Sequence, residues 1–323
     1  MSKLIRKSGS ICNVRKQADI RCDFLGLRLK SPTVLASGII GTSADLLERA
    51  ARCGAGIVTS KSCGPYEREG HPNPVSVAWT GGIINAVGLS NPGAEQEAHM
   101  LREAKLRLSP LGVPLMASIF APDVQGFAQV AEVISQAQPD LIEVNISCPN
   151  VSDEFGIPFA GSPETAAQVT AAVRAVTQIP LCVKLAPNVP SIGRVARAVV
   201  EAGANAITAI NTMPGMLVDA QAGHAVLSNN FGGLSGWSLK PVALRCVAEI
   251  YQAVQVPVIG TGGISSGIDA AEMIMAGATA VGVGTAVWQR GPEVFDLINS
   301  ELREFMQQEG YPDLTSMRGI ALR

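Results

Sequence analysis

The stretch PVIGTGGISSGIDAAEMIMAGATAVGVGTA, residues 257–286, contains one complete strand–helix–strand unit. Its two ends, PVIGTGG (257–263) and AVGVGTA (280–286), are short apolar runs, which is typical of fully buried parallel strands. The segment between them ends in MAGATAV, where a glycine shortly before the second run indicates the end of a helix. The same placement of glycine recurs before two earlier apolar runs, so this unit belongs to a series.

Comparable apolar runs extend the series toward the N-terminus: PTVLAS (32–37), GIVTSKS (56–62), PLMASIF (114–120), LIEVNIS (141–147), PLCVKLAP (180–187) and AITAINT (206–212). Helix-period stretches lie between most of them. The stretch 162–178 opens with Ser162, Pro163 and Glu164, the preferred order of an N-cap, a first-turn proline and a first-turn acid. About eight strand-then-helix units without a break in composition predict a single (β/α)8 TIM barrel over residues 22–323. A doubly wound sheet is the alternative fold.

Composition restricts the class of protein. The 323 residues are 47% hydrophobic and 16% charged with a net charge of −2, so we expect a large core and no nucleic-acid-binding surface. We also expect no membrane span and a cytoplasmic location, because neither a long apolar run nor an apolar signal segment occurs. Residues 1–21 are expected to form a basic N-terminal arm, with a transit peptide as the alternative.

The seven cysteines are scattered without a CxxC pair. Iron–sulfur clusters and structural metal ions need several thiolates that converge on one site. We therefore expect reduced thiols and no metal site in this chain. Cys182 and Cys246 are interpreted as small core residues.

In a barrel of this kind the active site lies at the carboxyl ends of the strands. Lys61 and Lys184 end otherwise apolar strands, and burying a lysine is costly unless an anion or several acceptors meet it. The polar and glycine residues at these ends are Ser37, Gly38, Lys61, Ser62, Ser118, Asn145, Ser147, Cys148, Lys184, Asn211, Thr212, Gly262, Gly263, Gly284 and Thr285.

The last two predicted strands favour a phosphate site. GTGGISSG (260–267) and VGVGTAVW (281–288) place glycine amides before expected helix starts, where unpaired N–H groups attract an anion. Barrels frequently bind phosphate after strands seven and eight. The alternative is that these glycines only make tight turns.

Cys148 lies where a buried strand becomes a loop, beside Asn145, Ser147 and Asn150. A free cysteine is often only a small buried hydrophobe. Here the neighbouring lysines favour a functional thiol, and a proton acceptor suits it because a thiol titrates closer to neutrality than a hydroxyl.

Taken in order, seven motifs resemble class 1 dihydroorotate dehydrogenase, from about residue 22 to the end: TSKS (59–62), INAVGL (84–89), VNISCPN (144–150), LCVKLAPN (181–188), INTMPGM (210–216), GGLSGWSLKPVALR (232–245) and VIGTGGISSGIDAAEMIMAGA (258–278). The sixth and the extended motif NTMPGMLVD (211–219) are most similar to the class 1B branch. The resemblance implies one FMN in this chain and electron transfer to NAD through a separate subunit that carries FAD and a 2Fe–2S cluster. It also implies a homodimer, or a heterotetramer with that subunit.

The same resemblance implies roles at the substrate. Cys148 would be the base that removes the C5 proton of dihydroorotate while hydride leaves C6 for flavin N5, and Lys61 would meet the substrate carboxylate and the flavin. The substrate would be held by Asn85, Val87, Gly88, Leu89, Asn145, Asn150, Asn211 and Thr212.

For the cofactor, the resemblance implies that Lys184 lies near flavin N1 and O2 and stabilises charge on the reduced ring. The full set of cofactor-binding residues would be Ser37, Gly38, Lys61, Ser62, Ser118, Asn145, Lys184, Gly236, Gly262, Gly263, Gly284 and Thr285.

The chain also departs from the family pattern. Ser118 replaces a frequent Asn, Val77 replaces an Arg, Trp237 replaces a Pro, and the segment 150–164 is not the commoner glycine-rich lid. An FMN enzyme similar to dihydropyrimidine dehydrogenase, acting on dihydrouracil or dihydrothymine, is therefore the alternative function. A non-catalytic barrel that binds a phosphorylated ligand, and fumarate as electron acceptor, are further alternatives.

Overall fold

The computed structural model describes residues 18–147 and 161–323. Eight parallel strands close into a barrel in the order β10-β11-β12-β17-β18-β3-β4-β9. The strands are β3 (Thr33–Leu35), β4 (Ile57–Thr59), β9 (Leu115–Ile119), β10 (Leu141–Asn145), β11 (Leu181–Leu185), β12 (Ala206–Ala209), β17 (Val258–Thr261) and β18 (Ala280–Val283). Each lies within one of the predicted apolar runs. The TIM barrel is confirmed, and closure of the sheet excludes the doubly wound alternative.

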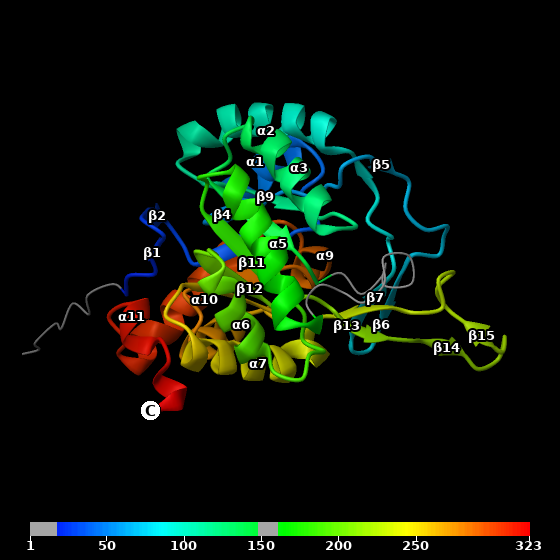
Figure 1. The fold of residues 1–323 in the computed structure, drawn as a ribbon. Coiled ribbons are helices and arrows are strands. Elements are labelled where there is room, and N and C mark those ends of the chain that lie inside the picture. The colour runs from blue at the N-terminus through cyan, green and yellow to red at the C-terminus, as the bar shows by residue number, and fades with distance from the viewer. Residues whose placement is uncertain (1–17, 148–160) are drawn as a thin grey trace, which may run out of the picture.

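Helices surround this barrel (Figure 1). They are α1 (Ala44–Arg52), α2 (Ala94–Leu108), α3 (Val124–Ser135), α5 (Pro163–Val176), α6 (Ile192–Glu201), α7 (Lys240–Ala253), α8 (Gly267–Met275), α9 (Thr285–Arg290), α10 (Val294–Glu309) and α11 (Leu314–Met317), with short 3-10 turns at Ser109–Leu111, Trp237–Leu239 and Ile320–Leu322. The predicted N-cap of α5 is confirmed, since the Ser162 side chain accepts from the N–H groups of Glu164 and Thr165. Within the described residues, none of these helices is both long and apolar enough to cross a membrane.

The interior of the barrel has an apolar layer and a polar layer. At the amino ends of the strands, β1 (Cys22–Phe24) and β2 (Leu27–Leu29) form a hairpin whose Phe24 and Leu29 join one buried apolar cluster with residues of the barrel strands. Toward the carboxyl ends the buried side chains are polar, and they include Ser118, Glu143, Lys184 and Thr208. Since burying such groups is unfavourable unless they are paired, this layer is the floor of a site rather than ordinary core.

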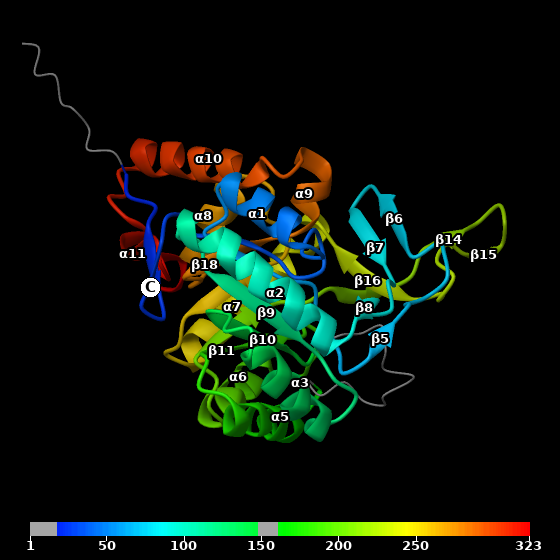
Figure 2. The same ribbon diagram turned by 90° about the horizontal axis from the view of Figure 1, so that it is seen from above.

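Two long connections leave the barrel and fold together. Residues 64–93 contain β5 (Glu67–Arg68), β6 (Ser76–Trp79), β7 (Gly82–Asn85) and β8 (Asn91–Pro92). The second connection contains β13 (Met213–Gly215), β14 (Val218–Asp219), β15 (His224–Ala225) and β16 (Gly232–Ser235). A four-stranded sheet β13-β16-β7-β6 joins the two connections and stands apart from the helices (Figure 2).

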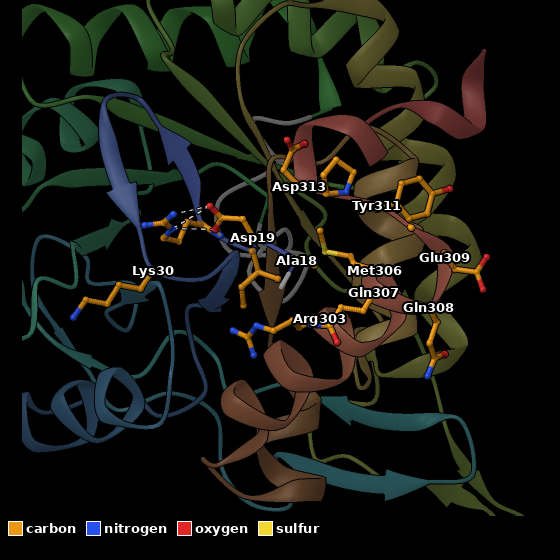
Figure 3. Close-up of a pocket in the computed structure, with 14 residues that line it drawn as sticks. Ala18, Asp19, Lys30, Arg303, Met306, Gln307, Gln308, Glu309, Tyr311 and Asp313 are labelled. Atoms are coloured by element: carbon orange, nitrogen blue, oxygen red, sulfur yellow. Dashed lines mark hydrogen bonds and ion pairs between the residues drawn. The ribbon is translucent and has the colours of Figure 1, made fainter. Parts of the chain in front are cut away.

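The first described residues pack on the C-terminal segment. Ala18 and Ile20 are buried, and the Asp19 N–H donates to the Pro312 carbonyl at 3.0 Å. A broad hollow of about 1060 Å³ lies beside them, between residues 18–30 and the end of α10 (Figure 3). It adjoins the β1–β2 hairpin, at the amino ends of the barrel strands, so it is separate from the polar floor described above.

Candidate active site

A cavity of about 340 Å³ lies at the carboxyl ends of the barrel strands. Residues within or just after seven of the eight barrel strands line its wall, together with residues of β6, β7 and β16 in the extra sheet. Of the residues singled out in the sequence, the cavity brings together Ser37, Gly38, Lys61, Ser62, Asn85, Val87, Gly88, Leu89, Asn145, Lys184, Asn211, Thr212, Gly236, Gly262, Gly263, Gly284 and Thr285. Cys148 and Asn150 lie outside the described residues.

A chain of hydroxyl and amide groups runs along one side of this cavity. Ser62 Oγ is 3.0 Å from Ser37 Oγ and 2.8 Å from Ser118 Oγ, and it accepts from Asn145 Nδ2 at 3.1 Å. Asn145 Oδ1 in turn accepts from Ser147 Oγ at 3.0 Å. These contacts fix the side chains before any ligand arrives, which lowers the entropic cost of binding.

Two further asparagines hold the rim of the cavity in place. Asn211 Nδ2 donates to the Ser147 carbonyl at 2.8 Å, and Asn211 Oδ1 accepts from the Thr212 N–H at 2.9 Å. Asn85 Nδ2 reaches the Gly233 carbonyl at 3.4 Å, across the β7–β16 pairing. The extra sheet therefore positions Asn85 over the barrel.

The glycine loops form a narrow cradle at another part of the wall. Gly263 has φ +76°, and a Cβ there would lie 2.5 Å from the Lys240 Cβ, so only glycine fits. Thr285, the first residue of α9, follows Gly284 and donates its hydroxyl to Ser235 Oγ at 2.9 Å. The backbone can therefore approach an anion closely here.

The start of α8 is already capped by a side chain. The Asp269 carboxylate accepts from the Ser265 and Ser266 N–H groups at 2.9 Å each, and Lys240 Nζ lies 2.6 Å from it. These contacts lower the pKa of Asp269 against the opposing effect of burial. The amides of Ser265 and Ser266, just before α8, are thus satisfied internally, and the Gly267 N–H donates to Glu301 Oε2 at 2.7 Å. We therefore expect an anion at the Gly262, Gly263, Gly284 and Thr285 part of the cavity wall.

Lys184 on β11 is buried and lines the floor of the cavity. Its Nζ lies 3.6 Å from Oε1 of Glu143 on β10, and that oxygen also accepts from Ser118 Oγ at 2.9 Å. Sequence reasoning did not single out Glu143. The available signal was an acid within the otherwise apolar run LIEVNIS, which is as unusual as a lysine there.

Lys61, just beyond β4, has a buried acid behind it on α2. Glu97 is 2% exposed, and burial raises its pKa to about 7, although the Ser60 hydroxyl and the charge of Lys61 oppose that rise. Within the described part of the chain its Oε1 has no hydrogen-bond partner. Lys61 thus lines the cavity and is also close enough to Glu97 for its charge to act on that acid.

A family model described as dihydroorotate dehydrogenase matches residues 20–306. The chain belongs to this family. The resemblance inferred from the motifs is thereby confirmed, and the strand-end residues assembled in the cavity are those that carried it.

Relatives place the chain in the class 1B branch. Proteins named dihydroorotate dehydrogenase B (NAD(+)), catalytic subunit, are similar along nearly their whole length. The one from Methanosarcina mazei is 43% identical over 308 residues, 95% of this chain and 96% of its own. Those from Methanothermobacter thermautotrophicus (41% over 313 residues, 97% of each chain) and Pyrococcus abyssi (39% over 304 residues, 94% and 99%) agree.

The position of two residues differs from what the resemblance to dihydroorotate dehydrogenase predicts for the site. Ser118 is fully buried below the cavity and contacts Ser62 and Glu143 rather than lining the wall. Trp237, noted only as a departure from the family pattern, lines the wall together with Ile39 and Trp288. These three side chains are 48%, 39% and 64% exposed, so they form an apolar rim at the cavity mouth.

Proposed function

We propose that this chain oxidises dihydroorotate to orotate with FMN, as a step of pyrimidine biosynthesis. The single observation that supports it most is the cavity that unites Lys61, Lys184, three asparagines and the glycine cradle at one end of the barrel. Family membership and the names of the relatives point to the same reaction.

The residues present fit FMN. The cradle, where a Cβ at Gly263 would meet Lys240, allows backbone amides to hold the phosphate. Lys184 on the floor supplies a positive charge for the pyrimidine edge of the ring. When bound, FMN supplies the acceptor for the hydride that leaves C6 of the substrate. Ser37, Gly38 and Gly236 of the wall would contact the flat ring.

The protein's own groups then handle the substrate and its proton. We assign Lys61 to the carboxylate, and Asn85, Asn145 and Asn211 to the ring amides and carbonyls. Val87, Gly88, Leu89, Thr212 and Asn150 complete this set, and Cys148 takes the C5 proton.

Dihydroorotate is preferred over an uncharged dihydropyrimidine. Dihydrouracil has no carboxylate to meet Lys61 on the cavity wall, so it forgoes a charge-assisted contact that dihydroorotate can make, and a site built for such a contact favours the substrate that carries the group. We expect dihydroorotate, and not dihydrouracil, to bleach the flavin of the purified chain under anaerobic conditions. Bleaching by dihydrouracil alone would reverse the assignment.

The relatives are named as catalytic subunits, so this chain works with another subunit. We propose a partner that carries FAD and a 2Fe–2S cluster, in a cytoplasmic heterotetramer built on a homodimer of this chain. Ile39, Trp237 and Trp288 offer this partner an apolar contact surface beside the cofactor. The lone chain should then reduce NAD slowly and recover with that partner, whereas rapid fumarate reduction by the lone chain would contradict the class 1B assignment.

A further inference from the structure

Glu143 is a buried acid that the proposed chemistry leaves without a role. It is 1% exposed, on β10 inside the barrel, and it is not part of the cavity wall. An ionised carboxylate in a dry interior is strongly unfavourable unless it is paired and hydrogen-bonded. The structure supplies both kinds of contact, one to Lys184 and one to Ser118.

The two members of the pair differ in their access to the site. Lys184 lines the cavity wall and also a small internal gap of about 10 Å³ beneath it, whereas Glu143 lines only the gap. The positive end of the pair therefore faces the site and the negative end faces away. At low dielectric constant the carboxylate still reduces the field that the ammonium exerts on a neighbouring group.

A second connection links Glu143 to the site. Ser118 donates to Glu143 Oε1, and the Ser118 hydroxyl lies 2.8 Å from Ser62 Oγ, which lines the cavity. Ser62 is in turn hydrogen-bonded to Ser37 and Asn145. Glu143 therefore interacts with the cavity wall in two ways. Its charge acts on Lys184, and its hydrogen bond to Ser118 connects it to Ser62.

We propose that Glu143 is a positioning residue that holds the Lys184 ammonium at the cavity floor and offsets part of its charge, so that it limits how strongly the site stabilises negative charge on bound FMN. This inference rests on the proposed function, because it requires FMN in the cavity. Glu143 would then affect the reduction potential of the bound FMN without taking part in the reaction of the substrate.

Sulfite titration measures this control without turnover. Sulfite adds through its sulfur lone pair to flavin N5 and leaves the resulting negative charge at N1 and O2, so its dissociation constant reports how well the site holds that charge. Glu143→Gln keeps the size of the side chain and an acceptor for Ser118 but removes the charge. We expect the FMN-loaded variant to bind sulfite on the order of tenfold more tightly than the wild type, with a more positive midpoint potential.

Glu48→Gln is the matched control, since it makes the same change in net charge on the outer helix α1, where Glu48 pairs with Arg52. Its sulfite affinity should equal that of the wild type. Equal sulfite affinity and potential in Glu143→Gln and wild type, with FMN bound to both, would overturn the inference. A wild-type chain that binds no FMN would instead overturn the proposed function.

Glu143→Gln leaves a buried lysine without its counter-charge, which destabilises some proteins. Glu143→Asp keeps the charge and withdraws it by one methylene from Lys184, so this variant retains an ion pair. We expect it to bind sulfite more tightly than the wild type and less tightly than Glu143→Gln. Sulfite binding in Glu143→Asp that is no tighter than in the wild type would also contradict the proposed role.

Discussion

Glu97 is the buried acid whose ionisation should be visible in stability. Its pKa in the folded chain is about 7, against an ordinary value of 4.5, because burial disfavours the charged form. The folded state therefore holds the proton more tightly than the unfolded state. Below about pH 4.5 the buried carboxyl does not lower the free energy of unfolding. As the pH rises to about 7 it lowers that free energy progressively, by roughly 3 kcal/mol in all.

Glu97→Gln should remove this dependence. We expect the free energy of unfolding of the variant, relative to wild type, to increase between pH 5 and pH 8 by roughly 2 to 3 kcal/mol. Urea unfolding at the two pH values measures it. A difference between variant and wild type that does not change with pH would show that the carboxyl titrates normally.

Cys148→Ala tests the proposed base. The variant should bind FMN normally, but dihydroorotate should reduce that FMN at least about a hundredfold more slowly, which is the usual contribution of a general base. Stopped-flow bleaching under anaerobic conditions gives the rate. Cys53→Ala is the control, because Cys53 caps the end of α1 and lies outside the cavity wall. Equal rates in Cys148→Ala and wild type would remove the thiol from the mechanism.

At the scale of elements, the β1–β2 hairpin closes the amino end of the barrel. Phe24 is fully buried in the cluster that fills this end. Phe24→Ala should lower the free energy of unfolding by about 3 to 5 kcal/mol, since it removes a large side chain from a close-packed site. Leu106→Ala on α2 is the control, because Leu106 is 76% exposed and should change stability little. A loss below about 1 kcal/mol in Phe24→Ala would contradict the role of the hairpin as a plug.

The loop after β17 is the element that we assign to the phosphate. Gly263→Ala places a methyl group against Lys240 in a left-handed backbone position, and it should weaken FMN binding by at least about tenfold. Gly310→Ala is a matched control, because Gly310 has φ +80° but open space around its Cα, at the end of α10. Fluorescence titration of the apoprotein with FMN separates the two, and equal affinities would place the phosphate elsewhere.

For the whole molecule, the barrel could be predicted because its signals are local. Each strand is a short apolar run, and each barrel strand, such as β11 at Leu181–Leu185, needs only its own residues to be recognised. The cavity followed from one rule of barrel geometry, which brings Lys61, Asn145 and Gly262 to the same end.

The rest depended on pairings between distant residues. The sheet formed by β7 and β16 pairs Asn85 with Gly233, and no local pattern in either segment signals that partner. The role of Glu143 could not be predicted for the same reason, because it depends on the contact with Lys184 on the neighbouring strand. The position of Ser118 near a strand end predicts a place at the cofactor, but it does not specify depth, and the Ser118 hydroxyl is buried against Glu143 beneath the cavity wall.

The most direct test of the site is a crystal structure of the purified chain with FMN and orotate. We expect the flavin phosphate on the amides of Gly262, Gly263, Gly284 and Thr285, the pyrimidine edge of the flavin beside Lys184, and the orotate carboxylate at Lys61. Density for FMN outside this cavity, or orotate bound away from the flavin ring, would contradict the proposed gathering of these residues around one cofactor.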